Sequence, residues 1–173
     1  NPNQVVAGAH HYMHIMGIVA LGLMWIRMGE VALDALAAGT GDKAFVGGAE
    51  LEALGSLDPA SARDFIGLVH DACAAMRDCP LPVIARINGY CIGGALELVA
   101  ACDLRIAADH ARFGMPEVRL GIPSVIEAAL LPRLMGAGRA RWLLLTGELI
   151  DANEALRWGL VGRIAPLAGL DTE

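Results

Sequence analysis

The chain has 173 residues, of which 55% are hydrophobic and 5% aromatic, and its formal net charge is −6 at pH 7. This length suits a single domain with its own core, and the acidic balance argues against a nucleic-acid-binding protein. The apolar content predicts exposed apolar surface that missing parts of the fold or partner subunits would cover. The four cysteines form no Cys-x-x-Cys pair and have no zinc spacing, which suits the reducing cytoplasm.

Residues 4–38 predict one long helix, with Asn3 as its cap and a glycine directly after it as its stop. The apolar run over residues 15–26 is shorter than the about twenty residues that cross a bilayer. Histidines rather than a charged start precede this run, so we expect neither a membrane span nor an export signal. His10 and His14 lie one helical turn apart, but no third ligand accompanies them, so we expect no metal site there.

A first glycine-rich segment is Gly-Asp-Lys-Ala-Phe-Val-Gly-Gly-Ala-Glu at residues 41–50. It predicts a turn before a helix through Leu51 and Leu54, and its amides could offer an N–H donor to a ligand. Farther along, Ser-Leu-Asp-Pro at residues 56–59 predicts the start of a helix that runs to Cys79.

A second glycine-rich segment, Ile-Gly-Gly-Ala-Leu-Glu, occupies residues 92–97. A strand-like run at 82–87 and an Asn-Gly turn precede it, and residues 94–102 predict a helix. The first amides of a helix have no intrahelical acceptor, so a carbonyl oxygen that develops negative charge near Gly94 would be stabilised. Gly93 and Gly94 have no Cβ, which lets a ligand approach the main chain closely.

Two carboxylates accompany these donors. Glu97 lies on the first turn of the predicted helix, and Phe-Gly-Met-Pro-Glu at 113–117 places Glu117 in a predicted loop. Each has a simpler interpretation, with Glu97 as a helix-start acid stabilised by the dipole and Glu117 as a solvated loop residue. Taken together, the donors and acids indicate a site that polarises a carbonyl and moves a proton.

Several motifs in order resemble the crotonase, or enoyl-CoA hydratase and isomerase, superfamily over about residues 41–166. Besides the glycine-rich segments, the resemblance rests on Ala-Cys-Asp-Leu-Arg-Ile-Ala at 101–107, on the loop at 113–117, and on the run Leu-Leu-Leu-Thr-Gly-Glu to Trp-Gly-Leu-Val at 143–161. The resemblance implies an α/β fold built as a ββα superhelix, here expected to be incomplete at both ends and preceded by the N-terminal helix.

The resemblance also implies an enzyme that adds water across the double bond of a 2-enoyl-CoA thioester. It implies no cofactor beyond the coenzyme A of the substrate, and a homo-oligomer, which is a trimer or hexamer in the family. The matching residues are Ala49 and Gly94 for the oxyanion hole, Glu97 for water activation, Glu117 for protonation of the α-carbon, and Gly47, Gly48, Gly93 and Lys43 for substrate binding. Two other interpretations stay open: a double-bond isomerase, and a non-catalytic acyl-CoA-binding or assembly fragment.

The segment after the second glutamate departs from the family. Hydratases have a Leu-Gly-Leu-Ile-Pro-Gly-Ala-Gly-Gly type of stretch there, whereas residues 120–127 read Leu-Gly-Ile-Pro-Ser-Val-Ile-Glu. We expect Ser124 to cap a helix that runs to Met135, and Glu127 to be a solvated first-turn acid. The altered pocket wall leaves the acyl group unnamed.

Three further polar residues are assigned on the same grounds. Asp103 is expected to satisfy backbone donors after the helix. Lys43 and Arg86 are the candidates for a local basic patch toward the anionic coenzyme A, although each is expected to be an ordinary surface cation.

Residues 3–28 are similar to the C-terminal helical part of some acyl-CoA dehydrogenases. We therefore divide the chain into an N-terminal helical segment, residues 1–40, and a crotonase-like core, residues 41–173. The hypothesis is a junction of two families near residues 40–45.

Overall fold

The computed structural model describes residues 44–47 and 54–172. The predicted helix over residues 4–38 and the predicted site residues Lys43, Gly48 and Ala49 lie outside this part. Within it, helices and strands alternate in a mixed α/β fold, which confirms the expected fold class.

The strands of the described part form two sheets. The first contains, in this order, β1 (Ala44–Val46), β3 (Tyr90–Ile92), β5 (Arg112–Gly114) and β6 (Ile150–Asp151), with only β6 antiparallel to its neighbour. The second is parallel and contains β2 (Ile84–Ile87), β4 (Leu104–Ala108) and β7 (Arg163–Ala165). The turn predicted over residues 41–50 is wrong for residues 44–46, because hydrogen bonds to β3 hold them as a strand.

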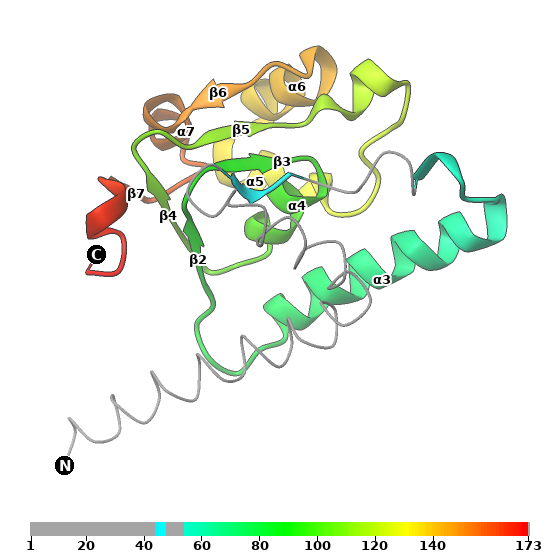
Figure 1. Ribbon diagram of the computed structural model, residues 1–173, viewed down its shortest axis with the longest axis horizontal. Coiled ribbons are helices and arrows are strands. Elements are labelled where there is room, and N and C mark those ends of the chain that lie inside the picture. Colours follow the sequence, from blue (N-terminus) through cyan, green and yellow to red (C-terminus); the bar gives the residue numbers. More distant parts are fainter. Residues whose placement is uncertain (1–43, 48–53, 173) are drawn as a thin grey trace.

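The chain passes repeatedly from one sheet to the other. It leaves β2 through Asn88 and Gly89, enters β3, and then forms helix α4 (Gly94–Ala100) before β4 and β5 repeat the step. Figure 1 shows β3, β5 and β6 beside one another, with β2, β4 and β7 forming the other layer. This strand-strand-helix repeat places the start of α4 directly after a strand of the first sheet.

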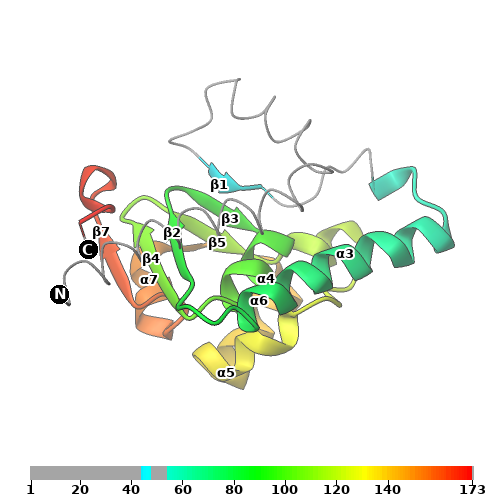
Figure 2. The same cartoon turned by 90° about the horizontal axis from the view of Figure 1, so that it is seen from below.

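The long helix α3 (Pro59–Arg77) packs against α4 (Figures 1 and 2). Its N-cap is Asp58, whose side chain accepts hydrogen bonds from the amides of Ala60 and Ser61 and forms a capping box with Ser61. The start predicted within Ser-Leu-Asp-Pro is therefore confirmed, and the helix ends two residues before Cys79.

The second half of the described part is rich in short helices. These are the 3-10 helices η1 (Pro116–Leu120), η2 (Ala128–Leu130) and η3 (Leu167–Gly169), and the α-helices α5 (Leu131–Met135), α6 (Ala137–Thr146) and α7 (Ala152–Trp158). The helix predicted to begin at Ser124 is wrong: the helical run begins only at η2, and the amide of Ala128 donates to Glu97 instead of to a serine cap. Figure 2 shows α5 on the opposite side of the fold from β1.

One apolar core joins these elements. Its largest fully buried side chains include Ile87 of β2, Leu96 of α4, Phe113 of β5 and Leu143 of α6. All four cysteines are free thiols, and no helix within the described ranges is long and apolar enough to cross a bilayer.

Candidate functional site

A cavity of about 350 Å³ lies beside the N-terminus of α4. One wall is apolar and comes from α3 and from residues 122–126, which lie between η1 and η2. Five of the predicted site residues line the cavity together, namely Gly47, Gly93, Gly94, Glu97 and Glu117. The fold therefore brings together residues that lie seventy positions apart in the sequence, from 47 to 117.

Gly93 is the residue before α4, and only glycine suits its position. Its φ of 62° and ψ of −130° lie in a region that L side chains rarely adopt. Its amide donates to the carbonyl of Gly114 over 2.9 Å. A Cβ built on Gly93 would lie 2.6 Å from Oε1 of Glu117, so the Glu117 carboxyl group lies directly against the turn that starts the helix.

Gly94 is the first residue of α4, so its amide is one of those that have no intrahelical acceptor. A Cβ on Gly94 would meet no atom within 4 Å, because this position faces open space at the cavity. A ligand oxygen at this place could accept the hydrogen bond from the Gly94 amide and would lie at the positive end of the helix dipole.

Glu97 projects from the first turn of α4 and is 2% exposed. Its Oε1 accepts hydrogen bonds from the amides of Glu127, at 3.0 Å, and Ala128, at 2.8 Å. Burial raises the pKa of Glu97 above its ordinary value, and the nearby Glu117 carboxylate adds to the increase, whereas the two amides oppose it. Its contacts with a segment thirty residues away go beyond those of a simple helix-start acid.

Glu117 lies on η1, at the edge of the same cavity. Its Oε2 is buried, and it is the one buried side-chain oxygen or nitrogen of the described part that has no hydrogen-bond partner there. The interpretation of Glu117 as a solvated loop residue does not fit this burial. The Glu117 carboxylate lies close enough to Glu97 to raise the Glu97 pKa, so the two acids interact electrostatically.

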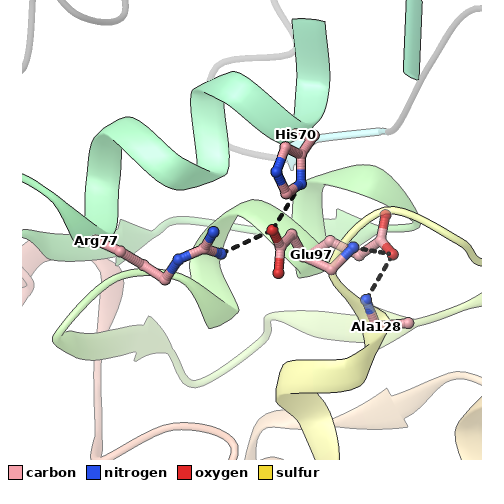
Figure 3. Close-up of polar contacts among 5 residues, drawn as sticks. His70, Arg77, Glu97 and Ala128 are labelled. Carbon is pink, nitrogen blue, oxygen red and sulfur yellow. Dashed lines mark hydrogen bonds and ion pairs between the residues drawn. The ribbon is translucent and has the colours of Figure 1, made fainter. Parts of the chain in front are cut away.

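Glu127 is not the solvated acid that the sequence predicted. It is 7% exposed, and its Oε1 lies 2.8 Å from Nη1 of Arg77 and 3.0 Å from Nδ1 of His70. Figure 3 shows that both partners project from α3 toward one carboxylate. Sequence reasoning missed this cluster, although His70 and Arg77 are seven residues apart and so lie on one face of the helix.

Two other predicted residues lie away from the cavity. Asp103 accepts a hydrogen bond from the amide of Val83 through Oδ2 at 2.8 Å, which confirms that it satisfies a backbone donor, although this donor lies before β2 and not after α4 as expected. Arg86 forms an ion pair with Asp171 and does not line the cavity. In the part of the chain that is described, no group of three or more His, Cys, Asp or Glu side chains could hold a metal ion.

Helix-start amides beside an interacting carboxyl pair are typical of enzymes that stabilise an enolate oxygen and move protons. The enoyl-CoA hydratase/isomerase family profile matches residues 33–173, and a profile described as acetyl-CoA dehydrogenase C-terminal like matches residues 1–49. The chain therefore belongs to the enoyl-CoA hydratase/isomerase family.

Individual relatives agree with this membership. The chain is 45% identical to a crotonyl-CoA hydratase of Syntrophomonas wolfei over 73% of its own length and 49% of the relative, and 38% identical to a short-chain-enoyl-CoA hydratase of Clostridium acetobutylicum, with 79% and 55% covered. An enoyl-CoA hydratase structure from Bacillus anthracis superposes with a TM-score of 0.73 at 39% identity, covering 76% of this chain and 52% of the other. The chain spans about half the length of the curated relatives it matches.

Proposed function

We propose that this protein adds water across the double bond of a 2-enoyl-CoA thioester. The observation that carries the proposal is the pairing of Glu97 with Glu117 in one cavity, where Glu117 has a buried oxygen with no hydrogen-bond partner among the described residues. A carboxyl group in this state is available to a water molecule or to a reacting carbon. The helix-start amide of Gly94 lines the same space.

The proposed reaction begins with the thioester oxygen held by the amides of Gly94 and Ala49. Glu97 takes a proton from water while the water oxygen forms a bond to the β-carbon, and the π electrons move to give an enolate oxygen. Glu117 then gives a proton to the α-carbon and restores the thioester carbonyl. Removal of one oxyanion donor would reduce the rate by roughly a hundredfold or more.

The surroundings of the cavity suit a substrate with an apolar acyl group. An apolar lining comes from α3, through Phe65, Ile66 and Val69, and from the segment after η1, through Ile122 and Val125. We propose that the acyl chain lies along this wall, with the thioester at the start of α4. Coenzyme A is part of the substrate in this proposal, and no further cofactor takes part.

The test is an assay of the purified chain with crotonyl-CoA, read as loss of the conjugated thioester absorbance. We expect Glu97→Gln and Glu117→Gln each to lower kcat by roughly a hundredfold or more, because each removes an acid–base group. The matched control is Glu154→Gln on α7, outside the cavity, which should retain full activity.

Other outcomes favour other functions. Conversion of a 3-enoyl-CoA into the 2-enoyl isomer without hydration of crotonyl-CoA would indicate an isomerase. Binding of the thioester without turnover would indicate an acyl-CoA-binding fragment. Absence of both binding and turnover would contradict the proposal.

We further propose a cytoplasmic location and a homo-oligomeric state. The location is supported by the four free cysteines, which suit a reducing compartment. The oligomer is supported by large apolar side chains at the surface of α6, where Trp142 is 55% and Leu145 is 72% exposed.

A further inference from the structure

Glu127 connects helix α3 to the proposed catalytic base. Its side chain pairs with Arg77 and His70 of α3, and its own backbone amide donates to Oε1 of Glu97. Glu127 does not line the cavity, so it acts on the site only through its hydrogen bond to Glu97 and the segment that it holds in place. Figure 3 shows this arrangement, with His70 and Arg77 on one side and Glu97 on the other.

The segment that carries Glu127 is held in place by these hydrogen bonds and ion pairs, and we call the ion pairs to α3 its tether. Residues 122–127 have neither helical nor strand structure, and they follow Gly121, which has a φ of 72°. The amides of Glu127 and Ala128 bind Glu97 on one side of this segment, and the Glu127 carboxylate binds α3 on the other. A shift of the segment would therefore move both donors that hold the Glu97 carboxylate.

The positive charge that balances the Glu127 carboxylate comes from side chains of α3. Cys73 lies near both Glu127 and Glu97, and burial together with these two carboxylates raises the pKa of its thiol to about 12, so it stays neutral. Glu117, on η1, is an acid that interacts with Glu97, so it supplies no positive charge that could balance Glu127. Among the described residues, the positive groups that reach the Glu127 carboxylate are Arg77 and, when protonated, His70.

We propose that the Arg77–Glu127 ion pair, supported by His70, is a positioning device that fixes the amides of Glu127 and Ala128 and thereby aims Glu97 at the attacking water. The inference rests on the proposed function, in which Glu97 takes the proton from water. Arg77 and Glu127 are positioning residues here, because neither touches the substrate.

The test compares Glu127→Gln, Arg77→Met and the double variant in the crotonyl-CoA assay. Each single change should lower kcat about tenfold to a hundredfold, as a misplacement of about 1 Å does, while KM changes less than about threefold. The kcat of the double variant should be about as low as that of the less active single variant and no lower, because the two residues act as one unit. Arg77→Lys should recover part of the activity, and the acid limb of the kcat profile should move to higher pH as Glu97 loses its donors.

The matched control is Arg157→Met, which removes a 71% exposed arginine that pairs with Glu154 on α7 and should leave kcat unchanged. Unchanged kcat in both single variants, or losses that simply add in the double variant, would overturn the inference.

A second measurement separates this inference from the proposed function. Amide hydrogen exchange of a peptide covering residues 126–130 should become faster in Glu127→Gln and Arg77→Met, while that of α7 stays unchanged. If the unmodified chain shows no turnover, the hydratase proposal fails, and faster exchange still supports the tether. Exchange at residues 126–130 equal to that of the unmodified chain would overturn the tether whatever the activity.

Discussion

At the scale of single residues, two features of Gly93 make a side chain unfavourable at this position. Its φ of 62° favours glycine for the backbone, and Oε1 of Glu117 lies only 2.6 Å from where a Cβ would be. The Glu117 side chain could move aside from a methyl group, but the backbone strain would remain. A substitution at Gly93 therefore affects both stability and the position of Glu117.

We expect Gly93→Ala to lower the free energy of unfolding by about 1–3 kcal/mol because of its strained φ and ψ. It should also lower kcat at least about tenfold, because the methyl group displaces the carboxylate of Glu117. Urea unfolding and the crotonyl-CoA assay measure the two effects. Gly94→Ala is the matched control for stability, since its Cβ meets no atom within 4 Å, and an equal loss of stability in the two variants would contradict the argument.

The raised pKa of Glu97 predicts how stability depends on pH. Its folded-state pKa lies above the ordinary value of 4.5, so its contribution to stability is fully present below about pH 4.5 and is lost as pH rises through the folded pKa. Glu97→Gln keeps an oxygen that accepts from Glu127 and Ala128 but carries no charge. We expect this variant to gain stability relative to the unmodified chain between pH 4 and pH 8, measured by urea unfolding. A difference that stays constant with pH would be the contrary result.

At the scale of elements, the side chains of β2 alternate between a buried face and an exposed face. Ala85 and Ile87 are buried whereas Ile84 is 47% exposed, because successive side chains point to opposite faces. The buried face packs into the core that supports α4. The same alternation gives a matched pair of variants.

We expect Ile87→Val to lower the free energy of unfolding by about 0.5–1.5 kcal/mol, because one methyl group leaves a fully packed position. Ile84→Val on the same strand should change it by less than about 0.5 kcal/mol. Thermal and urea unfolding measure both, and equal effects would show that the exposed face of β2 is covered in solution.

At the scale of the whole molecule, the surface of α6 exposes the large apolar side chains of Trp142 and Leu145, and the proposed homo-oligomer would cover them. We expect Leu145→Lys to weaken self-association at least about tenfold, because a lysine ammonium would be buried without a partner. The molar mass from light scattering over a range of concentrations measures this, with Arg141→Lys on the same helix as control. An unmodified chain that is monomeric at every concentration would refute the oligomer.

Much of the fold could be predicted from local patterns. The strand within residues 82–87, the helix start within residues 56–59 and the helix start at Gly94 depend on neighbours in sequence, so a short β-branched run, proline placement and glycine placement indicated them. Residues 44–46 were missed as a strand because pairing with β3 decides their state. The start of the helical run at Ala128 was missed because its amide is satisfied by Glu97, thirty-one residues away.

By itself, the sequence determined the family, the α/β class and the five described residues that line one cavity, because ordered motifs and glycine-led helix starts are local properties of the chain. Only the tertiary structure decided the burial of Glu97, the ion pair of Arg77 with Glu127, and the buried Glu117 oxygen that has no hydrogen-bond partner among the described residues. These depend on distances between segments far apart in sequence, and the burial and charge pairing of an acid arise only when such segments pack together.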